Sequence, residues 1–344
     1  MTGRLDSLGL WEAMLGLPEQ VEQAIAEGAA PGLPSPVRID SVLLLGMGDS
    51  GISGEVAAAC AQPFCPVPIV VHHGYLPPSF VGPSTLVVAL SSSGDTEETI
   101  ESLDSAVEAG APLLAVTTGG ALAELTRAAG GTVLPIPTDR PAPRAPLGSL
   151  SVPPMLALEV MGLFPGADQW LRQAVDQLRR RRDQLLSDRS PARELARRIG
   201  RTLPIMYGGG AIGQTAAKRW KNEFNLNVKS PAFWAPMPEL CHNELSGWGQ
   251  HGDVTRQVFT QVNLRHDFEH PQTTRRFDYV DRVTLEVVHD ILSVAAQGDG
   301  QVAQLFDLIL VGDITSLELA GREGLDPGPV PVLDDLKGWL AQGA

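Results

Sequence analysis

Five short apolar runs in the first part of the chain, separated by helical patterns, most constrain its fold. They lie at residues 41–45, 67–72, 85–90, 112–117 and 132–136. A strand that is apolar along its whole length, rather than at every second residue, is buried on both faces. Intervening helices, such as those expected at residues 55–62 and 97–109, supply the covering layers. The pattern predicts a doubly wound α/β domain with a parallel sheet.

A second unit of the same kind is expected further along the chain. A strand at residues 203–207 runs into three glycines and a helix at residues 211–222. Apolar and β-branched residues predict further strands at residues 257–264, 283–289 and 305–312. The sequence therefore predicts two α/β domains in tandem, although the two halves are not alike enough to be called a sequence repeat.

The stretch between these units is rich in proline and then in helix-forming residues. Residues 138–154 are expected to form an extended connector, and residues 155–199 to form helices interrupted at Pro165 and Pro191. The expected division is an N-terminal domain at residues 1–153, a helical connector at 154–200 and a C-terminal domain at 201–344.

Charge and composition exclude several classes of protein. The 344 residues include 26 Lys and Arg against 40 Asp and Glu, a net charge of −14, so a nucleic-acid partner is not expected. The run Arg179–Arg182 is interpreted as a solvated helix face that pairs with acidic residues. No apolar run is long enough to cross a membrane, and residues 1–15 do not resemble a signal peptide, so we expect a cytoplasmic protein.

The three cysteines predict neither a disulfide framework nor a metal site. Cys60, Cys65 and Cys241 are too few for a framework and lack the spacing of zinc ligands. We expect ordinary reduced thiols and no bound metal.

A glycine-rich turn follows the first expected strand. Residues 46–51 read G-x-G-x-x-G, which in a dinucleotide-binding domain is accompanied by an acidic residue after the second strand. Here His72 and His73 occupy that place, which disfavours a nicotinamide cofactor.

A second polar loop, residues 91–96, lies between the third strand and its helix. Ser91, Ser93 and Thr96 can present hydroxyl groups around free amides at a helix N-terminus, an arrangement that binds phosphate without a formal cation. Helix capping alone is the alternative, but a cap needs only one hydroxyl. We expect a phosphate site here, completed by Gly48 and Ser50 from the glycine-rich turn.

Taken together, Ser50 in its turn and the S-x-S-G-x-T loop resemble a sugar isomerase (SIS) domain, a flavodoxin-like fold. Four more motifs are similar to those of the bifunctional phosphoglucose/phosphomannose isomerase family. The resemblance extends from about residue 40 to the C-terminus. The four motifs are Pro143-Arg144-Ala145; Arg219-Trp220-Lys221 with Asn225-x-Asn227-x-Lys229; Pro238-Glu239-Leu240-Cys241-His242-Asn243-Glu244; and Asp326-Pro327 with Leu336-Lys337.

The resemblance implies a sugar 6-phosphate substrate, no cofactor and a homodimer, with His242 a candidate to act across the subunit interface. By the same resemblance, Arg144 would stabilise an enediolate, His242 would open the sugar ring and Lys337 would assist near the ring. The reaction implied is the interconversion of glucose 6-phosphate or mannose 6-phosphate with fructose 6-phosphate.

Two positions depart from the family pattern. The glutamate that the family places between two asparagines is replaced by Leu226, which cannot accept a proton, and a usual glycine is replaced by Asp49. Two interpretations stay open. Either a nearby carboxylate, Glu223 first and otherwise Glu239 or Glu244, serves as the base, or the chain is a phosphosugar-binding or regulatory protein that no longer isomerises its ligand.

Overall fold

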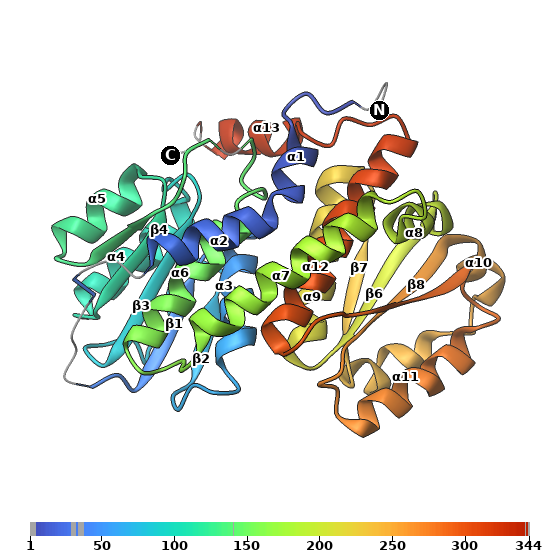
Figure 1. The fold of residues 1–344 in the computed structure, drawn as a ribbon, viewed down its shortest axis with the longest axis horizontal. Coiled ribbons are helices and arrows are strands. Elements are labelled where there is room, and N and C mark those ends of the chain that lie inside the picture. Colours follow the sequence, from blue (N-terminus) through green and yellow to red (C-terminus); the bar gives the residue numbers. More distant parts are fainter. Residues whose placement is uncertain (1–4, 29–31, 34–37, 140, 341, 343–344) are drawn as a thin grey trace.

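The first sheet is parallel and has the strand order β2-β1-β3-β4-β5. The computed structural model describes residues 5–28, 32–33, 38–139, 141–340 and 342 (Figure 1). The strand order of this sheet, in which β1 lies between β2 and β3, is that of flavodoxin-like folds. The strands are β1 (Ser41–Leu45), β2 (Ile69–His72), β3 (Thr85–Ser91), β4 (Leu113–Thr117) and β5 (Thr132–Pro135), and they confirm the five that the sequence predicts.

A second parallel sheet has the order β7-β6-β8-β9, which repeats the first four positions of the first sheet. The prediction of two tandem α/β domains with parallel sheets is therefore confirmed. The two halves therefore share a strand order, although their sequences are not alike enough to be called a repeat. The strands are β6 (Leu203–Gly209), β7 (Phe233–Met237), β8 (Phe259–Arg265) and β9 (Asp290–Ala295).

Alternate residues of β1 enter two different hydrophobic clusters, as expected of a strand buried on both faces. Leu43 and Leu45 pack with residues of α4 (Glu97–Glu108) and α5 (Gly120–Ala128). Val42 and Leu44 belong to the larger cluster, which includes α3 (Gly48–Ala61) and α6 (Leu147–Val160).

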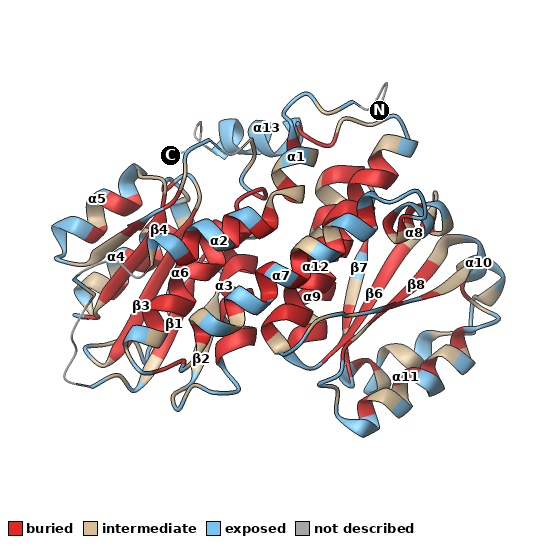
Figure 2. Ribbon diagram, viewed as in Figure 1, coloured by how far each residue is buried: buried red, intermediate tan, exposed pale blue. Residues whose placement is uncertain are grey.

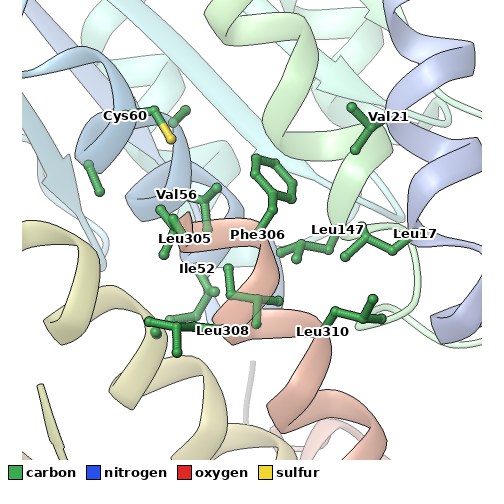
Figure 3. Close-up of a cluster of buried hydrophobic side chains, with 14 of the residues drawn as sticks. Leu17, Val21, Ile52, Val56, Cys60, Leu147, Leu305, Phe306, Leu308 and Leu310 are labelled. Carbon is green, nitrogen blue, oxygen red and sulfur yellow. The ribbon is translucent and has the colours of Figure 1, made fainter. Parts of the chain in front are cut away.

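The larger cluster continues without interruption into the second domain. Its central element is α12 (Gln301–Arg322), which is buried over most of its length (Figure 2). Figure 3 shows Leu305, Phe306 and Leu308 of α12 among Ile52 and Val56 of α3. Burying each such side chain contributes about 1.5–3 kcal/mol. A single shared core therefore holds the two sheets together.

The remaining helices complete the layers around this core. α1 (Leu10–Leu15) and α2 (Leu17–Glu27) precede the first sheet, and α7 (Ala167–Leu186) and α8 (Pro191–Ile199) connect the domains. The second domain adds α9 (Gly210–Glu223), α10 (Gly252–Val258) and α11 (Pro271–Thr284), and α13 (Pro331–Leu340) lies near the C-terminus.

Two of the strands predicted in the second half are wrong. Residues 305–312 lie inside α12, because a helix packed on all sides is apolar all round and has no helical periodicity to reveal it. Residues 283–289 are the end of α11 and a turn before β9. The strand expected at 257–264 is displaced by about two residues and is β8.

The expected extended connector is also partly wrong. α6 begins at Leu147 and contains Pro153 and Pro154, and its first twelve residues are all buried against neighbouring elements. Packing on this scale outweighs the intrinsic helix penalty of proline, about 3 kcal/mol. The boundary expected between residues 153 and 154 falls within this helix. The helical segments expected around Pro165 and Pro191 are present as α6, α7 and α8.

The arginine run on α7 connects elements instead of facing solvent alone. Arg179 and Arg182 pair with Glu22 and Glu19 of α2, as the interpretation of a paired face expects. Arg181 differs, because it is buried and forms two hydrogen bonds with Asp307 of α12. The run therefore contributes one buried ion pair to the shared core.

Within the described part of the chain, no helix is long and apolar enough to cross a membrane. The same residues contain no cluster of three or more His, Cys, Asp or Glu side chains able to hold a metal ion. Cys60, Cys65 and Cys241 are free thiols, and burial raises the pKa of Cys60.

Candidate active site

The loop between β3 and α4 contains the expected hydroxyl groups. The Oγ atom of Ser91 lies 2.9 Å from Oγ1 of Thr96 and accepts a hydrogen bond from the amide of Gly94. The exposed Ser93 accepts from the amide of Asp95. Thr96 is the N-cap residue of α4, but its side chain makes no capping hydrogen bond. The first amides of α4 therefore have no side-chain cap, which suits an anion.

Two glycines allow this loop and the preceding turn to pack closely. Gly94 has a φ of 79°, and a Cβ atom there would lie 1.8 Å from the carbonyl oxygen of Gly119. A Cβ atom at Gly51 would lie 2.7 Å from both the Gly46 carbonyl and the His73 ring. Both positions require glycine.

Ser50 joins the two loops into one structure. It lies in the first turn of α3, just after Gly48, and its buried Oγ accepts a hydrogen bond from the amide of Ser92 at 3.1 Å. The structure therefore brings together Gly48, Ser50, Ser91, Ser93 and Thr96 at the carboxyl edge of the first sheet, where ligands bind in folds of this type.

Arg219 of α9 is the centre of a charged network between the domains. Its side chain is 0% exposed. Its nitrogens lie 3.1 Å from Oδ1 of Asp49, 2.9 Å from Oε1 of Glu223 and 3.0 Å from Oδ1 of Asp313. Burial disfavours the charged guanidinium, but the three carboxylates outweigh burial and raise the pKa of Arg219.

Arg144 lies beside this network and is only 4% exposed. Its carbonyl accepts a hydrogen bond from Arg219, and its Nε donates to Asn227 at 2.9 Å. Its Nη2 donates to the carbonyls of Pro327 and Gly328. Nη1 makes no hydrogen bond to any described residue, so one donor of this fixed guanidinium is available to a ligand. Burial lowers the pKa of Arg144, although Glu223 and Asp49 oppose this.

Glu223 is fully buried at the end of α9. One oxygen accepts a hydrogen bond from Asn227, and the other faces Arg219 in an ion pair whose geometry does not make a hydrogen bond. Burial, together with Asp49 and Asp313, raises the pKa of Glu223 well above its ordinary value. Because it is fully buried, this carboxyl group is not open to a ligand.

The segment carrying Leu226 has an unusual backbone. A π-helix (Phe224–Val228) extends α9, and Lys229 ends it with a φ of 58°. Such segments are common at functional sites. Lys229 donates to the carbonyls of Leu226 and Pro327, and burial and then the charge of Arg144 lower the pKa of Lys229 to about 8. Leu226 itself is partly exposed beside these groups.

The structure does not bring His242 to Arg144 within one chain. Asn227, the partner of Arg144, precedes β7, whereas His242 follows the carboxyl end of that strand in a short 3₁₀-helix (Glu239–His242). The two ends of the sheet are separated by the 14-residue α9, which spans about 21 Å. His242 is the last residue of this 3₁₀-helix and is exposed.

The other two candidate carboxylates lie near His242. Glu239 accepts a hydrogen bond from Asn243, and Glu244, in a second 3₁₀-helix (Glu244–Gly247), accepts one from Tyr207. Both are therefore remote from Arg144 in the same chain.

α13 is exposed along its length (Figure 2) and carries Lys337. No hydrogen bond or ion pair in the described structure links Lys337 to another candidate residue. The helix begins at Pro331, three residues after Gly328, whose carbonyl holds Arg144. The start of α13 is therefore close to the network, while the side chain of Lys337 remains unengaged.

Sequence reasoning did not assign roles to several residues of this site. The sequence shows Arg219 only as part of a motif and suggests no role for Asp313 or Ser316, although Ser316 accepts a hydrogen bond from Asn227. The signal for Asp313 and Ser316 is weak: they are polar residues in the long apolar segment that forms α12, and polar residues need partners when buried.

Comparison with known proteins agrees with the fold and the motifs. Residues 188–340 match the family described as bacterial phospho-glucose isomerase C-terminal SIS domain. The chain is 32% identical over 338 residues to the bifunctional phosphoglucose/phosphomannose isomerase of Caldicellulosiruptor bescii, covering 97% of this chain and 99% of the relative. It is 29% identical to the protein of the same name from Aquifex aeolicus, covering 88% and 91%.

A solved structure with the same fold is tagatose-6-phosphate ketose/aldose isomerase from Escherichia coli. It superposes with a TM-score of 0.70 at 15% identity and covers 93% of this chain and 95% of that one. The likeness over nearly the whole of both chains shows that the two-domain arrangement is shared. On the strength of the relatives at up to 32% identity, the chain belongs to the bifunctional phosphoglucose/phosphomannose isomerase family.

Proposed function

We propose that the protein is an aldose–ketose isomerase that interconverts glucose 6-phosphate or mannose 6-phosphate with fructose 6-phosphate. The proposal rests on one observation: a series of contacts joins the hydroxyl-rich loop to Arg144. Ser92 of the loop bonds to Ser50, the adjacent Asp49 pairs with Arg219, and Arg219 bonds to the Arg144 carbonyl. A phosphate on the loop would place the rest of a small sugar toward this arginine.

Each group then has a role that follows from its chemistry. Ser50, Ser91, Ser93, Thr96 and the Gly48 turn would hold the phosphate at the positive end of α4. The available Nη1 of Arg144 would donate to the oxygen on which negative charge develops in the enediolate. Lys337 would approach the sugar from α13. The reaction moves only protons, so side chains suffice and no cofactor is needed.

Ring opening requires His242, which lies at the far end of the second domain in its own chain. We propose that the protein is a homodimer and that His242 of a second copy completes each site. The exposure of His242 supports this arrangement. A cytoplasmic location fits a phosphorylated sugar substrate and remains a prediction.

A second function is favoured by one observation. Leu226 occupies the position at which the family carries its base, which suits a protein that binds sugar phosphates as a sensor or regulator without converting them. Such a protein would keep the phosphate loop and the arginine network but show no turnover.

A coupled assay with glucose 6-phosphate and mannose 6-phosphate, combined with calorimetric binding, separates these functions. Turnover to fructose 6-phosphate that is lost or weakened in Ser93→Ala supports the isomerase. The variant Asp176→Asn, which changes an exposed carboxylate on α7, is the matched control. Binding without turnover supports the regulatory function, and the absence of both rejects the phosphate site.

A further inference from the structure

The proposed isomerisation needs a carboxylate with an accessible oxygen between the phosphate loop and Arg144. The requirement is chemical, because a base must take the proton from C2 and return it to C1. Leu226 does not meet it. The carboxylates of the described residues that surround Arg144 and Arg219 are Asp49, Glu223 and Asp313.

Glu223 and Asp313 are unsuited to the task. Glu223 is 0% exposed and already engages Asn227 and Arg219. Asp313 receives two hydrogen bonds from Arg219, one on each oxygen, and is buried beneath it. Arg219 occupies both oxygens of Asp313, and the Oε1 atom of Glu223, which makes no hydrogen bond, is buried against Arg219. Neither carboxyl group therefore offers an accessible oxygen to a substrate.

Asp49 differs from both in its surroundings. Its side chain is 11% exposed, and only Oδ1 is engaged, by Arg219 at 3.1 Å. Oδ2 accepts no hydrogen bond from any described residue. Asp49 also immediately precedes Ser50, which bonds the phosphate loop, and its partner Arg219 bonds the Arg144 carbonyl. Its carboxylate therefore belongs to the set of contacts that joins the phosphate loop to Arg144.

The three carboxyl groups differ in their exposure to solvent. They surround two guanidinium groups, and Lys229 lies close to Arg144. Burial raises the pKa of Glu223 well above its ordinary value and also raises the pKa of Asp313. Asp49 is the most exposed of the three, at 11% against 0% for Glu223 and 4% for Asp313.

We propose that Asp49 is the catalytic base of this chain and transfers the proton between C2 and C1, which Leu226 cannot do. This inference rests on the proposed function. Oδ2 takes the proton from C2 as the C1 carbonyl becomes the enediolate oxygen beside Arg144. That oxygen gains a proton, the C2 hydroxyl loses one, and Oδ2 returns its proton to C1, leaving a carbonyl at C2. Glu223 is a positioning residue that holds Arg219 and Asn227.

The test compares Asp49→Asn, Asp49→Ser, Glu223→Gln and the double variant Asp49→Asn/Leu226→Glu, with Asp176→Asn as the matched control. Steady-state kinetics give kcat and KM for fructose 6-phosphate, and thermal unfolding checks the fold. Calorimetry with 5-phospho-D-arabinonate, whose carboxylate mimics the enediolate, reports whether the site remains assembled.

We expect Asp49→Asn to lower kcat by about 10²- to 10⁴-fold while KM and analogue binding change by less than about threefold. Asp49→Ser should behave alike, and it provides the measurement if the asparagine variant is poorly folded. The double variant should regain about tenfold or more of the lost kcat, because a carboxylate returns to the position at which the family carries its base. A merely structural role for Asp49 predicts lost analogue binding and no such rescue.

Full kcat in Asp49→Asn, with loss in Glu223→Gln, overturns the assignment and makes Glu223 the base. Loss of kcat together with loss of analogue binding also overturns it. If the unaltered protein shows no turnover and no deuterium uptake at C2 in D₂O, the proposed function itself fails, and the base assignment fails with it.

Discussion

Arg219 donates a hydrogen bond to Asp49 across the junction of the two domains, at 3.1 Å. Asp49 belongs to the first turn of α3 in the first domain, and Arg219 to the last turns of α9 in the second. The contact therefore connects the phosphate-loop side of the molecule to the network that holds Arg144. Both the stability and the activity of the protein should depend on this connection.

Arg219→Lys is expected to destabilise the protein by about 3–5 kcal/mol, since lysine lacks the fork that serves three carboxylates and would leave buried charges unpaired. Urea unfolding measures the change. The control is Arg172→Lys, which alters an exposed pair with Asp168. If Arg219→Lys destabilises the protein no more than Arg172→Lys does, the buried network does not contribute to stability as described.

Glu223→Gln is expected to change how stability depends on pH. Because the pKa of Glu223 is raised in the folded protein, the folded state keeps a proton that the unfolded state releases above about pH 4.5. Stability from this group is therefore present at acidic pH and declines as pH rises toward the folded-state pKa.

Glutamine mimics the protonated group, so the variant should lose this decline. Between about pH 5 and pH 8, the melting temperature of Glu223→Gln should therefore rise relative to that of the wild type as the pH increases. A constant difference between variant and wild type at every pH would show that Glu223 is ionised in the folded state.

Ser93→Ala and Ser91→Ala are expected to differ although both remove a loop hydroxyl. Ser93 is exposed, so its loss should raise KM for sugar phosphates by about tenfold, about 1.4 kcal/mol, with an unchanged melting temperature. Ser91 is buried and holds both Thr96 and Gly94, so its loss should also lower the melting temperature. Equal effects of both variants on stability would contradict the distinction.

Mixed dimers test whether His242 acts across subunits. His242→Ala and Arg144→Lys should each be inactive alone, because lysine does not reproduce the fixed guanidinium. Unfolding and refolding the two together forms hybrid dimers, in which one site contains Arg144 of one copy and His242 of the other. Activity should reappear in the mixture. Its absence, with hybrid dimers demonstrated by a size-distinguishing tag, would indicate that His242 serves its own chain or none.

Local patterns predicted much of this molecule correctly. The strands of the first sheet and the loop at residues 91–96 depend on short apolar runs and on hydroxyls within six residues, so the sequence displays them directly. The family motifs likewise identify Arg144 and His242 as candidates. These features require no knowledge of distant contacts.

Long-range contacts account for what the sequence did not reveal. α12 resembled a strand because helices from both domains surround it. β7 was missed because it is a five-residue edge strand that contains Pro236. Asp49 and Arg219 are 170 positions apart in the sequence, so the sequence alone does not reveal that they pair. It shows Asp49 only as an acidic residue next to a phosphate loop.

Proton exchange at C2 distinguishes isomerisation from binding in a single experiment. The protein is incubated with fructose 6-phosphate in D₂O, and nuclear magnetic resonance follows the products. The account predicts glucose 6-phosphate or mannose 6-phosphate carrying deuterium at C2, because the base exchanges its proton with solvent before returning it. Sugar phosphate that binds to the protein yet stays unconverted and free of deuterium would contradict isomerisation and leave a binding protein.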